Sequence, residues 1–100
     1  MSDRVFDALA DATRREVVRR LSERGPMTAT ELASELPVSR QAVAKHLSTL
    51  AEAGLVRSER LGREHRYRLT PAPLAEAVGW MASIGAEWDV RLERLRRLMG

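Results

Sequence analysis

The stretch from Pro37 to Val56, PVSRQAVAKHLSTLAEAGLV, carries the strongest fold signal in the chain. Ser39 is placed to cap a helix, because its hydroxyl oxygen can accept a hydrogen bond from a free N–H of the first turn. The apolar residues that recur at helical spacing are Val43, Leu47 and Leu50. Gly54 supplies a left-handed stop, with Leu55 folding back onto the helix. We therefore predict a capped amphipathic helix with one side exposed to solvent.

A second, shorter helix is predicted immediately before this one. Thr28 followed by Glu31 is a capping box, in which each side chain satisfies a free backbone amide of the other residue. The helix that opens there runs through Leu36, and Pro37 ends it. Two short helices joined by a turn of about three or four residues, the second capped by serine, are typical of a helix-turn-helix. We predict this motif over about residues 28–54.

Two further helices are predicted toward the amino terminus. The first covers about residues 3–9, and the apolar residues on its one side are Val5, Phe6 and Leu9. The second begins after Asp11, which is placed to cap it, and Gly25-Pro26 stops it. Its apolar stripe consists of Val17, Val18 and Leu21.

The segment LVRSERLGREHRYRL, residues 55–69, follows the helix-turn-helix and has two roughly alternating arms around Gly62. This pattern predicts a β-hairpin in which glycine supplies the turn, and such a hairpin would form a wing. The fold class is therefore mainly α with a small β-hairpin, a winged helix-turn-helix. No linker or repeat interrupts the chain, so we expect one domain over residues 1–100.

One long helix is predicted from Pro71 to about residue 99. Its apolar positions alternate steps of four and three residues, which is the spacing of a heptad seam. The seam positions are Leu74, Val78, Met81, Gly85, Trp88, Leu92, Leu95 and Met99. Such a helix buries poorly against one small domain, so the seam indicates a partner surface.

The exposed side of the helix after Ser39 offers groups that can read DNA. With the apolar side buried, the residues that point away are Gln41, Lys45, Ser48 and Glu52. Gln41 can pair with adenine through two hydrogen bonds, and Lys45 can reach guanine or a phosphate. Arg40 and the Ser39 hydroxyl lie near the DNA backbone in such a complex. The alternative is an ordinary solvated helix face, which carries the same residue types.

The hairpin and a border histidine extend this candidate site. Arg63 and Glu64 at the tip, with neighbouring arginines, can enter a minor groove or clamp phosphates, unless they only protect the hairpin edges. His46 lies between the buried and exposed sides and either binds backbone or phosphate or fills a boundary position. The predicted DNA-binding set is Ser39, Arg40, Gln41, Lys45, His46, Ser48, Arg60, Arg63, Glu64 and Arg66.

Composition narrows the functional classes. The chain has 100 residues, 44% hydrophobic and 31% charged, with a net charge of +3 whose excess lies between Ser39 and Leu69. No apolar run approaches the roughly 18 residues of a membrane helix, and no export signal opens the chain, so we expect a cytoplasmic protein without membrane contact. The absence of cysteine excludes disulfides and thiolate metal sites. The many arginines reflect either recognition of phosphates and guanines or a GC-rich coding genome.

Residues 8–71, ALADATRREVVRRLSERGPMTATELASELPVSRQAVAKHLSTLAEAGLVRSERLGREHRYRLTP, closely resemble the ArsR/SmtB family of bacterial winged-helix repressors. The most specific parts are ALADATRREV, VSRQAVAKHLSTLAEAGLV and GREHRYRL. The resemblance implies a homodimer in which the first and last helices pair across a two-fold axis. It also implies a double-stranded DNA operator, an imperfect palindrome read in successive major grooves.

The dimerisation residues that the resemblance and the seam together indicate are Val5, Phe6, Leu9, Val78, Met81, Trp88, Leu92 and Leu95. Trp80 and Trp88 either anchor the interface or line an effector pocket between paired helices. No cofactor is implied, and the effector is unknown.

Departures from the family pattern argue against metal sensing. Metal-sensing members carry Cys-x-Cys where this chain has Thr28-Ala29-Thr30, and other members bind zinc through histidine on the last helix, which has none here. His46 and His65 lie far apart and no third nitrogen or sulfur ligand exists. The last helix instead resembles a non-metal subgroup with a W…WD.RL..L signature.

Two other functional classes remain as alternatives. An enzyme is not expected, because no nucleophile elbow, phosphate loop or ligand cluster brings the polar residues together. A winged helix used only for protein contacts is compatible with the fold, because a fold does not fix a function. Salt-dependent binding to duplex DNA separates that alternative from a DNA-binding regulator.

Overall fold

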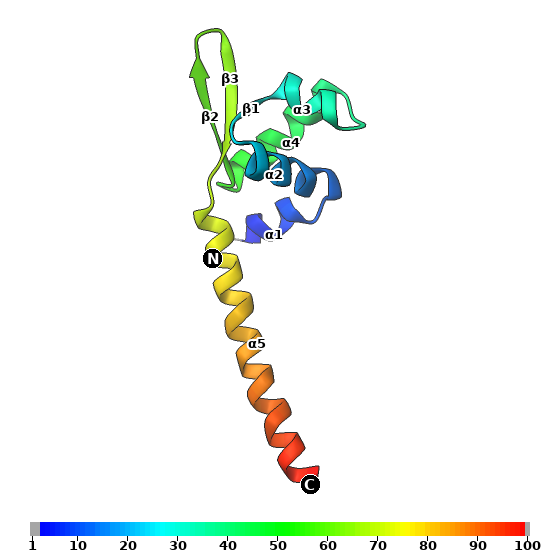
Figure 1. Cartoon of the computed structure of the whole chain (residues 1–100), viewed down its shortest axis with the longest axis vertical. Coiled ribbons are helices and arrows are strands. Elements are labelled where there is room, and N and C mark those ends of the chain that lie inside the picture. The colour runs from blue at the N-terminus through cyan, green and yellow to red at the C-terminus, as the bar shows by residue number, and fades with distance from the viewer. Residues whose placement is uncertain (1–2, 100) are drawn as a thin grey trace.

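The computed structural model describes residues 3–99 and places the predicted winged helix-turn-helix at one end of an elongated molecule (Figure 1). The elements in chain order are α1 (Asp3–Leu9), α2 (Ala12–Arg24), β1 (Met27–Thr28), α3 (Ala29–Glu35), α4 (Arg40–Glu52), β2 (Val56–Leu61), β3 (Glu64–Leu69) and α5 (Ala72–Met99). The helix-turn-helix is α3 and α4, and the wing is the hairpin of β2 and β3. The predicted fold class is confirmed.

The sheet contains one strand that the sequence did not predict. Residues Met27 and Thr28 pair antiparallel with β3, opposite Tyr67 and Arg66, so the strand order is β1-β3-β2. The two-residue strand has no alternating pattern of its own, and only pairing across some forty positions of chain creates it. This strand connects β3 of the wing to the start of α3.

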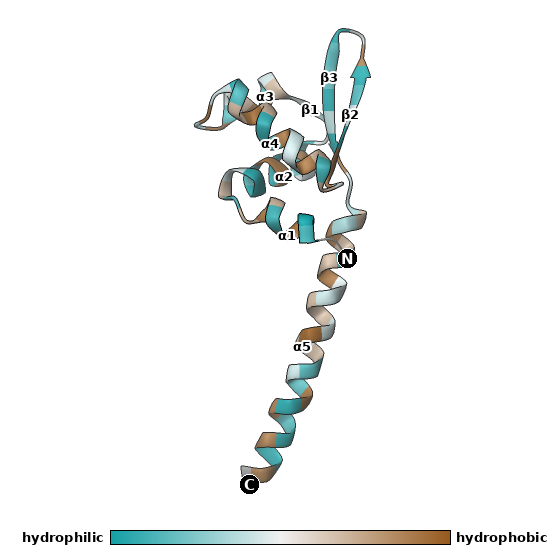
Figure 2. Cartoon of the chain, turned by 180° about the vertical axis from the view of Figure 1, so that it is seen from behind, coloured by the Kyte–Doolittle hydropathy of each residue, from teal (hydrophilic) through white to brown (hydrophobic). Residues whose placement is uncertain are grey.

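The core gathers one side of each helix in the body, and Figure 2 shows hydrophobic and hydrophilic residues alternating along these helices. Its buried members are Val5, Ala8, Val17, Leu21, Met27, Leu32, Leu36, Val43, Leu47, Leu50, Leu55, Val56 and Ala77. The stripe predicted for α4 is fully buried, because its three apolar residues repeat at the helical period and face α2 and α3. Full burial of such a side chain stabilises a fold by about 1.5–3 kcal/mol.

The assignment of Val5 to a dimer interface is corrected by this packing. Val5 is 3% exposed and lies in the core of the subunit itself, because α1 turns this side toward α2 and α4. Phe6 and Leu9 are partly buried against the same core, and the Phe6 ring meets Trp80 of α5 edge-on, with centroids 5.8 Å apart. Part of the apolar side of α1 therefore holds the chain's own helices together.

Arginine side chains close the carboxyl end of α1. The Nε of Arg14 donates to the Ala8 carbonyl at 2.7 Å, and Nη1 of Arg15 donates to the Leu9 carbonyl at 2.7 Å. These carbonyls end a helix and have no helical N–H partner, and a cation suits the negative end of the helix dipole. Asp11 caps the start of α2 by accepting from the Arg14 N–H at 3.0 Å. The ALADATRREV segment is thus a compact joint between two helices.

The other predicted caps are also present. The Ser39 hydroxyl accepts from the Ala42 N–H at 3.1 Å and opens α4. Gly54 adopts a φ of 77°, and the Leu55 N–H then reaches back to the Leu50 carbonyl at 2.9 Å. This closure lets Leu55 enter the core and turns the chain into β2.

The long helix α5 leaves the body after its first turns (Figure 1). Leu74 and Ala77 pack on the core, but the residues beyond them extend the molecule to 66 Å along its longest axis, against 25 and 22 Å across. The apolar side chains of α5 that remain largely exposed are Val78, Trp80, Met81, Trp88, Val90, Leu92, Leu95 and Leu98. The side chain of Met99, the last predicted seam position, lies outside the described part.

Replacing the cap of α2 tests the joint between α1 and α2. Asp11→Ala should lower the free energy of unfolding by about 1 kcal/mol at pH 7, because the Arg14 N–H loses its acceptor. Urea denaturation at fixed protein concentration measures this change, with Ser22→Ala on the exposed side of α2 as the matched control.

The same pair of proteins predicts a pH dependence. The Arg14 N–H lowers the pKa of Asp11 below its ordinary value of 3.8. A lowered pKa in the folded state stabilises the fold above the ordinary value, and this contribution is lost as the pH falls through the lowered one. The difference in stability between the native chain and Asp11→Ala should therefore narrow in acid below about pH 4. A constant difference down to pH 2 would contradict the assigned cap.

Candidate nucleic-acid interface

The outer side of α4 presents polar groups to solvent where the inner side fills the core. Gln41, Lys45 and Ser48 are exposed, whereas His46 is half-buried at the border between the two sides. The helix starts at the Ser39 cap, which satisfies a free N–H of the first turn and stabilises it. This side can approach a flat or grooved partner without displacing any part of the fold.

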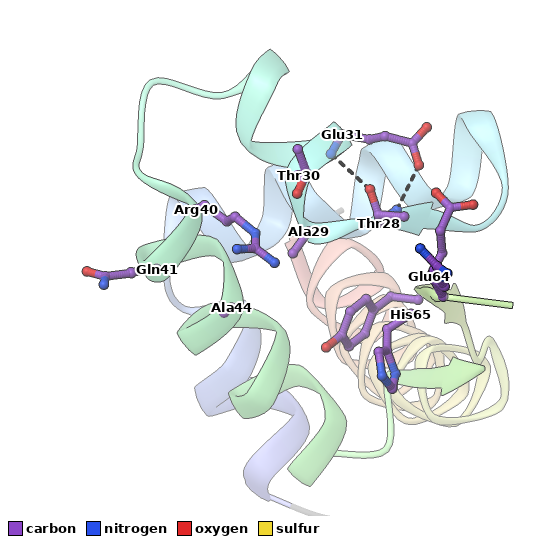
Figure 3. Close-up of a pocket in the computed structure, with 11 residues that line it drawn as sticks. Thr28, Ala29, Thr30, Glu31, Arg40, Gln41, Ala44, Glu64 and His65 are labelled. Carbon is purple, nitrogen blue, oxygen red and sulfur yellow. Dashed lines mark hydrogen bonds between the residues drawn. The ribbon is translucent and has the colours of Figure 1, made fainter. Parts of the chain in front are cut away.

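An open hollow of about 810 Å³ separates the start of α4 from the wing. It is lined by Thr28, Ala29, Thr30, Glu31, Arg40, Gln41, Ala44, Arg63, Glu64, His65 and Tyr67. In Figure 3 the Arg40 side chain extends into the hollow, whereas Gln41 extends from another side of α4. Three separate segments therefore form one concave surface: the start of α3, the first turns of α4 and the wing.

The acidic residues of the hollow are already occupied by internal partners. Glu31 accepts from the Thr28 N–H at 3.0 Å and lies 3.3 Å from Nη1 of Arg66, while Glu64 lies 3.3 Å from Nη2 of Arg66. The Thr28 N–H holds the pKa of Glu31 below its usual value, and the Arg66 charge adds to this effect. Glu31 is therefore charged at neutral pH, and both carboxylates have cationic partners within the chain.

The arginines that line the hollow, unlike its carboxylates, have no oppositely charged partner among the described residues. Within residues 3–99, neither Arg40 nor Arg63 forms an ion pair with an acidic side chain, and Lys45 on the neighbouring side of α4 forms none. Their charges are available to a partner from outside. The surface thus carries net positive charge at the two rims of the hollow, on α4 and at the tip of the wing.

Comparison with known proteins matches this geometry to a family. Residues 9–59 match the model of a helix-turn-helix domain. The HTH-type transcriptional regulator Rv2034 of Mycobacterium tuberculosis is 49% identical over 73% of this chain and 67% of its own length. A solved structure with a similar fold, that of the ArsR-like transcriptional regulator from Rhodococcus sp. RHA1, is 47% identical, with a TM-score of 0.83 over 96% of this chain and 90% of that one. The chain belongs to the ArsR family of winged helix-turn-helix transcriptional regulators.

A further relative carries the word repressor in its name. The transcriptional repressor SdpR of Bacillus subtilis is 32% identical over 77% of this chain and 84% of its own length. The similarity covers the helix-turn-helix and extends beyond it. This chain is therefore similar to a repressor over most of the length of both proteins.

The structure separates the predicted wing arginines of this regulator into two kinds. Arg66 is 29% exposed, bridges Glu31 and Glu64, and donates to the Pro26 carbonyl at 3.3 Å. Arg63 lies in the turn and forms no ion pair with an acidic side chain among residues 3–99. The structure therefore places Arg66 between the wing and the start of α3, where it helps to position the wing, and its contact with DNA stays a prediction.

Arg60 lies between these two cases. It is exposed near the wing tip, and its Nε donates to the Gly62 carbonyl at 3.2 Å, which steadies the turn. Gly62 has a φ of 66° and is the first of the two turn residues between β2 and β3, a position that favours glycine in such hairpins. Arg60 thus holds the tip in the shape that presents Arg63.

The sequence reasoning missed several members of the hollow. Thr30, Ala44, His65 and Tyr67 line it beside the predicted residues. His65 and Tyr67 are alternate residues of β3, so the two-residue period of a strand could have placed them on one side of the wing. Nothing in the sequence showed that this side faces α4, because that depends on how the wing is anchored.

No metal cluster or membrane helix is found in the part of the chain that the structure describes. Among residues 3–99 no three histidine or acidic side chains come together in a way that could hold an ion. The Thr28-Ala29-Thr30 segment lies at the hollow with its hydroxyls in or near the helix cap. No helix there is long and apolar enough to cross a membrane.

Arg66 and Arg57 form a matched pair for testing the anchoring of the wing. Arg66→Gln should lower the free energy of unfolding by up to about 1 kcal/mol and speed amide exchange in β3, because two carboxylates and a carbonyl lose their donor. Arg57→Gln should change neither, since Arg57 is 72% exposed and its carboxylate partner is 3.9 Å away. Urea denaturation and hydrogen exchange measure both effects. Unchanged stability and exchange in Arg66→Gln would contradict the role of Arg66 in anchoring the wing.

Proposed function

We propose that this regulator is a homodimeric repressor that binds an imperfectly palindromic DNA operator and acts in the bacterial cytoplasm. The observation that carries the proposal is the surface formed by the exposed side of α4 and the adjoining hollow. A major groove of B-DNA is about 12 Å wide and admits one α-helix, and base edges there are read by side chains such as glutamine and lysine. Gln41, Lys45 and Ser48 supply such groups on one side of α4.

The hollow has the shape and charge expected for a DNA backbone. When α4 enters a major groove, the strand that borders the groove must pass between α4 and the wing. Arg40 and Arg63 stand at the two sides of that passage, and Thr30 and Tyr67 also line it. Phosphate contacts of this kind position a protein, while contacts with base edges supply specificity. The wing tip is then directed toward the adjacent minor groove.

The exposed seam of α5 supports the homodimer. Trp88 and Leu95 lie on the side of α5 that carries the buried Ala77 near its start, yet each is about half exposed in the single chain. An apolar side of this length is rarely left in water by a stable protein. A second copy of α5 would cover it and place two α4 helices about 34–36 Å apart, one turn of DNA.

Selection of bound duplexes from a random pool, followed by titration in rising salt, tests the proposed function. A recovered sequence with two related half-sites, whose affinity falls steeply with salt, is the expected result. Absence of any duplex affinity at low salt would contradict it and favour the winged helix as a protein-binding module. The recovered duplex also serves the predictions that follow.

Gln41→Ala tests base reading by α4. It should reduce discrimination at one position of each half-site by an amount of order 1–3 kcal/mol, because the paired hydrogen bonds to a base are lost. Arg63→Ala should weaken all duplexes more evenly and reduce the salt slope by about one. Competition binding with single-position variants of the recovered duplex measures both. Equal losses on every duplex for Gln41→Ala would refute its role.

Trp88→Glu and Val90→Glu form a matched pair for testing the dimer. The two side chains are 55% and 53% exposed, but they point about 200° apart around α5. A charge on the seam at Trp88 should produce monomers and greatly reduce operator affinity, because the carboxylate would be buried at the interface. Val90→Glu should leave the dimer intact. Analytical ultracentrifugation measures the state, and a dimeric Trp88→Glu would count against the seam.

A further inference from the structure

We propose that Ala44 reads the 5-methyl group of a thymine in each half-site, beside the base read by Gln41. Ala44 is exposed on α4 and lines the hollow together with Arg40, although it carries no polar group. The inference rests on the proposed function and specifies which base chemistry the recognition surface selects. It arises from the placement of one small apolar side chain among polar ones.

The position of Ala44 on α4 carries the proposal. Gln41 precedes it by three residues and Ser48 follows it by four, so these side chains form one row along the helix. Around the helix axis Ala44 lies about 60° from Gln41, on the side that faces the hollow and the wing. It therefore sits between the position that reads base edges and the passage proposed for the phosphate strand.

The chemistry of the major groove places a methyl group at that location. Thymine is the one DNA base with a methyl group on its groove edge, and alanine is a side chain that contacts it. The 5-methyl group lies toward the backbone of its own strand, at the margin of the groove. A side chain that lies between Gln41 and the phosphate strand meets this methyl group first. A longer side chain at this position would instead project into the hollow.

The alternative explanation is that alanine occupies this exposed position only because it is a strong helix former. Ala51 separates the two explanations, because it is also exposed on α4 but lies two turns further on and does not line the hollow. Helix propensity applies to both alanines. A response to the thymine methyl group is expected from Ala44 alone.

The experiment replaces thymines of the selected duplex by uracil, one at a time, which removes only the 5-methyl group. For the native chain, replacing one particular thymine in each half-site should weaken binding about fourfold, the amount expected for burying one methyl-sized group. Ala44→Gly should bind the thymine duplex weaker by a similar factor and show no further loss with uracil. Ala51→Gly should keep the native response to uracil.

The outcomes separate this inference from the proposed function. If no uracil replacement weakens the native chain, or if Ala44→Gly stays as sensitive to uracil as the native chain, the assignment to Ala44 is overturned while DNA binding stands. If the pool yields no bound duplex, the proposed function itself fails. The arm with the native chain needs no variant, and circular dichroism confirms that both glycine variants keep their helices.

Discussion

The burial of one side of α4 is the constraint on which the recognition surface depends. Val43, Leu47 and Leu50 are wholly removed from solvent, and the helical period then fixes the direction of every other residue of the helix. Rotating α4 to present different residues would expose these three side chains and cost several kcal/mol. The orientation of Gln41 and Lys45 is thus a consequence of core packing, and the capped first turn keeps it rigid.

The wing depends on a second set of contacts, which are polar. β1 pairs with β3, and Arg66 connects the wing to Glu31 and to the Pro26 carbonyl at the start of α3. These contacts hold the wing at a fixed separation from α4 and so define the hollow. They also neutralise the acidic residues there, which leaves the uncompensated charge to Arg40 and Arg63. Arg66 therefore shapes the surface on which the charges of Arg40 and Arg63 are available to a partner.

In the helix α5, by contrast, the single chain leaves a row of apolar side chains exposed. Leu74 and Ala77 complete the core, but the seam beyond them faces solvent along most of α5 (Figure 1, Figure 2). A second copy would bury this seam and set the spacing between two recognition helices. The proposed functions of dimerisation and DNA reading would therefore lie at opposite ends of the molecule, joined by the core.

The sequence by itself determined the local features: the helices, the caps at Asp11, Thr28 and Ser39, the glycine turns and the buried side of α4. These follow from hydrogen bonds and periodicities that span only a few residues. Only the tertiary structure decided that Met27 and Thr28 form a strand, that Val5 belongs to the core, and that Arg66 bridges Glu31 and Glu64. It alone brought Ala44, His65 and Tyr67 to one hollow. Such contacts join residues far apart in the chain, and no local pattern records which segments will meet.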